Sequence, residues 1–251
     1  MADAWIWPTL LGVLGLVFGS FIATVAVRWP AGRSVADGRS KCDACGDELS
    51  AWELVPVLSY AVLLGKCASC RATIKPSHVF IELIAGAIGV GAGMAAPGLE
   101  GVAGAIFGWL LLTLAALDWA AFWLPDELTG ALAATGIVAG LFIDPDMLER
   151  LTGGLLGFVG LWLVAAGYRV LRGRDGLGGG DPKLFGGIGL WLGWQALPFV
   201  LLFASLAGLA GVLVLKLRGR AMGMQDRVPL GVALAASAWS VWFVGRMLGY
   251  A

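Results

Sequence analysis

Two aspartates stand at the ends of long apolar stretches. Asp118 closes the stretch LAALD, and Asp181 follows three glycines in GLGGGDPKL. Ionisable groups inside or at the edge of a bilayer are costly, so their default explanation is function. Two carboxylates that meet can share one proton, so that one acts as a base on water while the other polarises a carbonyl as an acid. The two aspartates are therefore candidates for acid–base chemistry if the fold brings them together.

The glycines before Asp181 also require an explanation. An aspartate before Pro182 fits a helix start, with aspartate as the N-cap and proline at the first helical position. That alternative leaves Gly178, Gly179 and Gly180 without a role. Because consecutive glycines permit close backbone approach, we expect these three residues to admit an extended peptide beside the aspartate.

The four cysteines form two CxxC pairs in the only long hydrophilic loop. Such pairs point their thiolates at one tetrahedral cation, typically zinc. Two disulfides are the alternative, but stable disulfides are rare in the cytosol, where we expect the loop to lie. Four thiolates leave no position open for water, so the predicted Zn²⁺ is structural. The predicted ligands are Cys42, Cys45, Cys67 and Cys70.

The composition indicates a membrane protein, because 59% of the residues are hydrophobic and only 14% are charged. Soluble domains carry roughly 25% charged residues. Eight apolar runs approach the ~17–25 residues that a helix needs to cross a bilayer. We therefore expect an all-α polytopic membrane protein with about eight transmembrane helices and a zinc-ribbon-like loop between the first two. The runs cover about 4–27, 79–96, 102–117, 128–143, 151–170, 184–197, 198–215 and 228–248.

The basic residues predict the orientation. With eight helices and the N-terminus outside, all of the 17 Lys and Arg residues except Arg150 and Arg246 fall on the inner side. This asymmetry is the positive-inside pattern, and it places the loop and both aspartates at the cytosolic side. The net charge of zero indicates no nucleic-acid partner, so membrane lipid is the expected surrounding. We divide the chain into a first transmembrane helix (1–27), a cytosolic zinc loop with all four cysteines (28–77) and a seven-helix catalytic bundle (78–251).

Several motifs occur in an order that resembles a known family. They are GSFIATVAVRWP, the paired CxxC loop, Asp118 eight residues before the aspartate of LPDELT, GxGGGDPKL and the late VPLGVALAASAW. Together they look like the prepilin leader peptidases, membrane aspartic peptidases of the GxGD type. The resemblance implies that Asp118 and Asp181 are the catalytic pair. It also implies an enzyme of the bacterial inner membrane that cleaves the leader of type IV prepilins or pseudopilins at the cytosolic face.

The resemblance extends to a second activity, because many members transfer a methyl group from S-adenosylmethionine to the new N-terminus. This sequence departs from the family pattern at Ala23, where an asparagine is usual, and at Val27, where a histidine is usual. It retains Glu82, which is the candidate residue for a methyl-transfer site. The alternative for Glu82 is a buried partner for a nearby Arg or Lys.

A transporter or assembly scaffold is the alternative function. In it, Asp118 and Asp181 would line a proton or cation path, and the zinc loop would dock a partner. Such a path needs a hydrophilic route to both faces. The outer halves of the predicted helices contain almost no polar residues, so a crossing route is hard to build.

Overall fold

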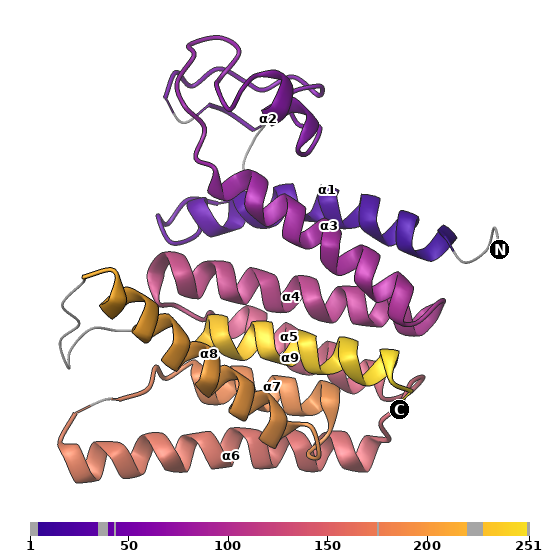
Figure 1. Cartoon of the computed structure of the whole chain (residues 1–251), viewed down its shortest axis with the longest axis vertical. Coiled ribbons are helices and arrows are strands. Elements are labelled where there is room, and N and C mark those ends of the chain that lie inside the picture. The colour runs from indigo at the N-terminus through magenta and orange to yellow at the C-terminus, as the bar shows by residue number, and fades with distance from the viewer. Residues whose placement is uncertain (1–4, 35–39, 43, 175, 220–227, 250–251) are drawn as a thin grey trace. The chain divides into compact units, whose positions relative to one another are not determined.

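A computed structural model describes residues 5–34, 40–42, 44–174, 176–219 and 228–249. The start of the first predicted span and three of the expected inner basic residues, Arg39, Arg220 and Arg227, lie outside these ranges. The described residues form helices, with no strand beyond two isolated bridges. The helices are α1 (Ile6–Arg28), α2 (Leu58–Val62), α3 (Ser77–Ala95), α4 (Leu99–Ala121), α5 (Asp126–Ala139), α6 (Met147–Arg172), α7 (Asp181–Leu192), α8 (Leu197–Leu217) and α9 (Leu230–Met247) (Figure 1).

Six of these helices are long and apolar enough to cross a membrane: α1, α3, α4, α6, α8 and α9. The prediction of an all-α polytopic membrane protein is thereby confirmed. The two remaining predicted spans correspond to α5 and α7, which have 14 and 12 residues. At 1.5 Å per residue they measure about 21 and 18 Å. Both are therefore shorter than the roughly 30 Å hydrocarbon core of a bilayer.

The chain divides into two compact units, Met1–Ala116 and Leu117–Ala251. In the first unit, α1 and α3 pack through glycines. A Cβ atom on Gly19 would lie 2.6 Å from the Cα of Glu82, and one on Gly93 would lie 2.5 Å from the nitrogen of Pro8. The two helices are therefore antiparallel and in backbone contact, as small residues allow between transmembrane helices. The segment between them carries the cysteines and the short helix α2.

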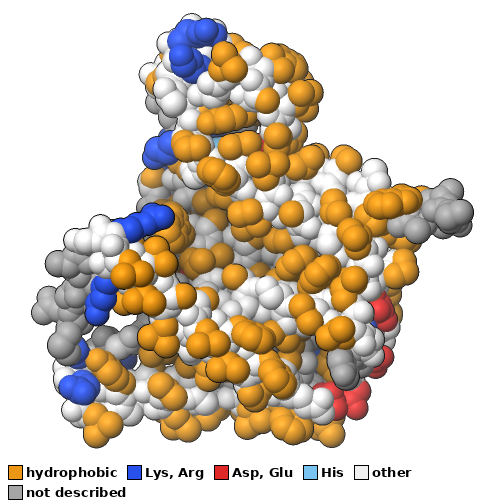
Figure 2. Space-filling view, in the orientation of Figure 1, with side chains coloured by type: hydrophobic (Ala, Val, Ile, Leu, Met, Phe, Trp, Pro, Cys, Tyr) orange, Lys and Arg blue, Asp and Glu red, His pale blue; other side chains and the backbone are white. Residues whose placement is uncertain are grey.

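In the second unit, α7 lies against both α5 and α6. A Cβ on Gly153 of α6 would lie 2.5 Å from the carbonyl oxygen of Gly189 of α7. On its other side, the indole Nε1 of Trp191 donates to the carbonyl of Leu132 in α5 at 2.8 Å. Hydrophobic side chains cover much of the visible helix flanks (Figure 2), as expected for surfaces that face lipid.

Candidate active site and cysteine cluster

Asp118 lies near the end of α4 and is only 6% exposed. Its Oδ2 accepts a hydrogen bond from the backbone N–H of Val232 at 3.1 Å. Val232 is in the first turn of α9, where backbone N–H groups have no partner within the helix and the helix dipole favours negative charge. A Cβ on Gly231 would lie 2.8 Å from the same Oδ2. The approach of α9 to the carboxylate therefore requires glycine at position 231.

Asp181 is the first residue of α7 and is also 6% exposed. Its Oδ2 accepts a hydrogen bond from the N–H of Gly178 at 2.9 Å. The N-cap position belongs to Gly180, and no side chain caps the helix, so the alternative of Asp181 as an N-cap is wrong. Position 181 precedes the apolar part of α7 and lies outside the six candidate spans. Burial, together with the negative charge of Asp118, raises the pKa of Asp181 to about 6.

Leu124, six residues after Asp118, contacts both the loop before α7 and the start of α9. A Cβ on Gly180 would lie 2.7 Å from the Cβ of Leu124, and a Cβ on Gly231 would lie 3.3 Å from its Cδ1. The glycine loop before α7 and the start of α9 therefore contact the same leucine. The end of α4 and the starts of α7 and α9 thus meet around Asp118 and Asp181, and all three segments belong to the second unit.

The three glycines before Asp181 have different surroundings. A Cβ on Gly178 would lie 3.1 Å from the Asp181 Oδ2, and one on Gly180 would collide with Leu124. A Cβ on Gly179 would meet no atom within 4 Å. A side chain at position 180 would therefore displace Leu124, one at position 178 would press on the Asp181 carboxylate, and open space adjoins Gly179.

An ion pair joins the starts of α5 and α7. The Nζ of Lys183 lies 2.6 Å from the Oδ1 of Asp126, and both side chains are substantially exposed. Exposed pairs contribute about 0–1 kcal/mol, so this contact orients the two helix starts more than it stabilises the fold. Sequence patterns carry no signal for this pair, because the residues are far apart in the chain and each follows a proline at a helix start.

The four cysteines form one cluster in the first unit. Their Sγ atoms all lie within 4.8 Å of one another, an arrangement that could hold a metal ion. The Sγ atoms of Cys42 and Cys70 are 3.9 Å apart, well beyond the roughly 2.05 Å of a disulfide bond. Backbone N–H groups of Cys45 and Ala44 lower the pKa of Cys42 to about 7, whereas hydrogen bonds with the other thiols help to raise the pKa of Cys45, as expected for thiols that share protons in one cluster.

The two CxxC segments have the same backbone construction. The N–H of Cys42 donates to the carbonyl of Asp47, and the N–H of Cys67 donates to the carbonyl of Ala72, each at 2.9 Å. The residue after each second cysteine has a left-handed conformation. It is Gly46 in the first segment, with φ of 77°, and Arg71 in the second, with φ of 61°. The second segment therefore carries backbone strain that the first avoids.

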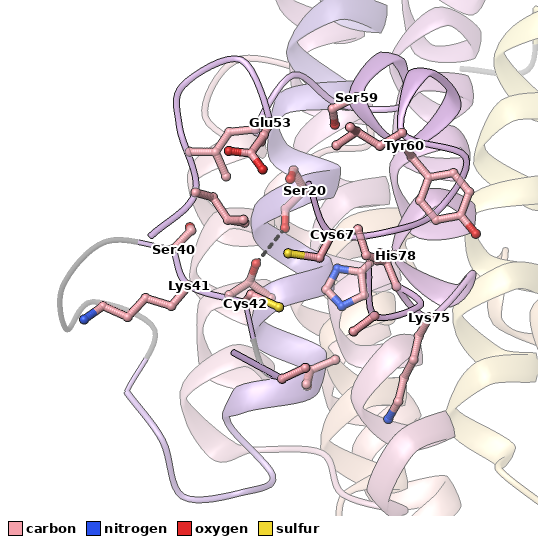
Figure 3. Close-up of a pocket in the computed structure, with 18 of the residues that line it drawn as sticks. Ser20, Ser40, Lys41, Cys42, Glu53, Ser59, Tyr60, Cys67, Lys75 and His78 are labelled. Atoms are coloured by element: carbon pink, nitrogen blue, oxygen red, sulfur yellow. Dashed lines mark hydrogen bonds between the residues drawn. The ribbon is translucent and has the colours of Figure 1, made fainter. Parts of the chain in front are cut away.

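A cavity of about 280 Å³ adjoins the cysteine cluster within the first unit. It is lined by residues of α1, the cysteine loop and the start of α3, including Ser20, Cys67 and His78 (Figure 3). Glu82 also lines it and is 8% exposed. Its Oε2 accepts a hydrogen bond from the N–H of Val57 at 2.8 Å, so the contact seen in the described part of the chain is a backbone group rather than Lys or Arg.

Val57, the partner of Glu82, has a positive φ of 62°. A β-branched residue in this region is strained, and such strain persists only where the surroundings impose it. The bond from Val57 to Glu82 therefore holds the loop in place against the start of α3.

Two family matches cover most of the chain, one over the part with the cysteine cluster and one over the part with the two aspartates. Residues 13–95 match the bacterial peptidase A24 N-terminal domain, and residues 105–215 match the type IV leader peptidase family. A protein of Burkholderia pseudomallei, named prepilin leader peptidase/N-methyltransferase, is 39% identical, and the alignment covers 93% of this chain and 84% of the relative. The chain belongs to the type IV leader peptidase family.

Two further relatives of this family carry the same name. The protein of Klebsiella pneumoniae is 38% identical, with 80% of this chain and 91% of the relative covered. That of Pseudomonas aeruginosa is 35% identical, with 90% and 87% covered. No solved structure is a significant match. Membership of a peptidase family confirms the prediction of an enzyme, and the comparisons do not favour the transporter or scaffold.

Proposed function

We propose that this protein is a membrane aspartic endopeptidase that cleaves the leader peptide of type IV prepilins or pseudopilins. The observation that carries the proposal is a pair of buried carboxylates, Asp118 and Asp181, close enough for the charge of the first to raise the pKa of the second, in a family of leader peptidases. Its relatives are named for the same reaction.

In this mechanism, the two carboxylates work as a pair that holds one proton. Two nearby carboxylates cannot both ionise easily, which is why one pKa of such a pair rises. One aspartate accepts a proton from the attacking water, and the other donates a hydrogen bond to the scissile carbonyl. The N–H groups of Gly178 and Val232 hold one oxygen of each carboxylate, and in this mechanism the second oxygens act on water and substrate. The opening beside Gly179 is where we expect the extended peptide to approach.

Cleavage of a synthetic prepilin leader by the purified protein in detergent tests this proposal. Asp118→Asn and Asp181→Asn should each reduce kcat by about 10²–10⁴-fold, the range of a lost acid or base. The control is Glu100→Gln, which neutralises a carboxylate in the first turn of the same helix as Asp118. The control should cleave normally. Wild-type cleavage by either asparagine variant would exclude the pair as the catalytic groups.

We also propose that the cysteine cluster binds one structural Zn²⁺. Four thiolates at this spacing suit tetrahedral zinc, and a site closed by four protein ligands has no position for a reacting water. The ion would fix the two CxxC segments and with them the loop that lines the cavity. In this proposal zinc supports folding of the loop, and the aspartate pair performs the hydrolysis.

The cavity of the first unit is our proposed site for S-adenosylmethionine. The relatives' names include N-methyltransferase, which supports a second activity here. When bound, this cofactor would supply the methyl group for the new N-terminus. Glu82 and Glu53 line the cavity, and carboxylates favour a cationic sulfonium group. Because Ala23 and Val27 depart from the family pattern, methyl transfer has to be tested separately from cleavage.

Transfer of labelled methyl groups to the processed N-terminus tests the methyl site. We expect Glu82→Gln to cleave at the wild-type rate, because its contacts lie in the first unit, and to lose most of the label. Glu48→Gln is the control, since Glu48 pairs with Lys41 at 3.6 Å on the exposed side of the same loop. Unlabelled product from the wild type would restrict the protein to peptidase activity.

We infer that the N-terminus lies outside and that the loop and both aspartates face the cytosol of a bacterium. The asymmetry of the Lys and Arg residues supports this orientation. It requires α5 and α7 to return the chain to the outer side despite their length. The last turns of α5 and α7 both lie beside the first turn of α6, so the three helices alternate in direction. A reporter enzyme that is active only outside the cytosol should be active when fused after the last residue.

A further inference from the structure

Arg150, near the start of α6, is the largest fully buried side chain among the described residues, with 0% exposure. Its five guanidinium N–H groups donate to six acceptors at 2.8–3.2 Å, with one N–H of Nη1 shared between two of them, and every acceptor is a backbone carbonyl. No carboxylate oxygen accepts from it in the part of the chain that the structure describes. The acceptors are the carbonyls of Gly136, Ile143, Asp144, Pro145, Leu190 and Trp191.

These carbonyls belong to the ends of the two short helices and to the loop between α5 and α6. Gly136 lies in the last turn of α5, and Leu190 and Trp191 lie in the last turn of α7. Carbonyls in a last helical turn have no partner within the helix, and the helix dipole makes that end negative. Two helix C-termini that meet at one point therefore provide the negative potential that a buried guanidinium needs.

The length of α5 and α7 explains why this cation is necessary. Helices of about 21 and 18 Å end before a membrane core of roughly 30 Å has been crossed. Hydrocarbon offers no hydrogen bonds, so each backbone group left unsatisfied there is destabilising. Arg150 donates to these groups from inside the protein, although the Gly136 carbonyl also accepts the N–H of Gly140. Its side chain occupies room that glycine provides, because a Cβ on Gly140 would lie 2.5 Å from the Arg150 Cδ.

The opposite end of α7 carries Asp181. From Leu190 back to Asp181 is about 14 Å along a continuous helix. A helix of 12 residues moves as one rigid element, so a shift at its C-terminal end is transmitted to the aspartate. Glycines at the contacts of α7 with α6 allow close packing, with Leu190 against Gly154 and Phe158 against Gly186. The hydrogen bonds of Arg150 add a directional contact at the C-terminal end of α7, which fixes the position of the helix along its axis.

We propose that Arg150 is a positioning residue for the aspartate pair. By holding the C-terminal ends of α5 and α7 on α6, it fixes the position of α7 along its axis and therefore the position of Asp181 relative to Asp118. The proposal rests on the proposed function, in which these two aspartates catalyse cleavage. A misplacement of about 1 Å can reduce a rate roughly 10²-fold, even when the substituted residue is far from the chemistry.

Kinetics of the purified Arg150→Lys and Arg150→Met variants test this role. Lysine retains the charge but has three donors at one point, so it cannot reach six separated carbonyls. We expect kcat to fall about tenfold in Arg150→Lys and about 10²-fold or more in Arg150→Met, with KM within about twofold of the wild type. The matched control is Arg246→Gln, which removes a 3.0 Å bond to the same Asp144 carbonyl from outside the cluster and should leave kcat unchanged.

The pH dependence of kcat separates positioning from simple instability. A changed separation of Asp118 and Asp181 alters their mutual repulsion, so the pH at half-maximal kcat should shift in Arg150→Lys. Loss of folded protein would lower kcat without moving that pH. An Arg150→Lys variant with wild-type kcat, or with reduced kcat and an unmoved profile, would overturn the inference, and this variant decides the matter if Arg150→Met does not fold. If Asp181→Asn is inactive in the same assay, such a result leaves the proposed function intact.

Discussion

Gly231→Ala is the smallest change that should disturb the aspartate pair. A Cβ built on Gly231 would lie 2.8 Å from the Oδ2 and 3.1 Å from the Cγ of Asp118. Gly231 is the second residue of α9 and does not have a positive φ, so alanine fits the backbone there. The added methyl group therefore acts on the carboxylate and not on the helix that carries it.

The size of the effect follows from the overlap. Ordinary van der Waals contact begins at about 3.4 Å, so the carboxylate has to retreat by roughly 0.6 Å. If a displacement of about 1 Å costs about 10²-fold, this retreat should lower kcat by about 10-fold, or ~1.4 kcal/mol in the activation free energy. Displacement of the carboxylate also lengthens its hydrogen bond from the N–H of Val232, which is 3.1 Å in the wild type. Stability should not fall with activity, since alanine is favoured over glycine within a helix by up to about 1 kcal/mol.

The assay is leader cleavage in detergent, with the thermal unfolding midpoint measured on the same samples. Gly130→Ala is the matched control, because a Cβ on this glycine of α5 would meet no atom within 4 Å. It should retain wild-type kcat and gain similar helix stability. The reasoning fails if Gly231→Ala cleaves as fast as Gly130→Ala, or if its loss of kcat is matched by a lower unfolding midpoint.

Three further predictions concern the same two regions. Because the pKa of Asp181 is raised to about 6, the wild type should lose stability as the pH rises from about 4 through 6. Near neutral pH, the free energy of unfolding of Asp181→Asn should therefore exceed that of the wild type by on the order of 2–3 kcal/mol, measured as a higher unfolding midpoint, and the difference should vanish near pH 4. Metal analysis of the wild type should find about one zinc per chain, and the Cys67→Ser variant should have lost it. Equal zinc content in the wild type and the variant would exclude the cysteine site. Arg71→Gly should relieve left-handed backbone strain worth about 1–2 kcal/mol and so raise the chelator concentration needed to remove the metal. Gly46→Ala should introduce such strain and lower that concentration. A change of the same sign in the two variants would contradict the strain argument.

The cysteine cluster could be predicted from the sequence because ligand spacing is local. Each CxxC pair places two thiolates on one turn, so the fold has only to bring the two turns together. The aspartates were predicted because a charge in an apolar stretch is conspicuous wherever it lies. Their surroundings were not predicted, since the N–H of Val232 reaches Asp118 from a helix that begins more than a hundred residues later.

Arg150 shows the limit of hydropathy analysis. A sliding window counts it as one of two outer charges and therefore as a residue beside water or lipid headgroups. In the folded chain it is enclosed by carbonyls of three segments. Glycines of α5 and its C-terminus make room for this arrangement: a Cβ on Gly136 would lie 3.0 Å from the carbonyl oxygen of Leu190, and one on Gly140 would lie 2.5 Å from the Arg150 Cδ. A hydropathy window reports composition along the chain. Burial of the kind seen at Arg150 depends instead on which helix ends come together in the fold.

The distribution of contacts between the two units separates the two proposed activities. Every described hydrogen bond that we found to Asp118 and Asp181 comes from the second unit. The cysteines, Glu82 and the cavity belong to the first unit. Loss of metal or of Glu82 should therefore affect methyl transfer before it affects the aspartate pair, because the hydrogen bonds that hold the two carboxylates come from the second unit.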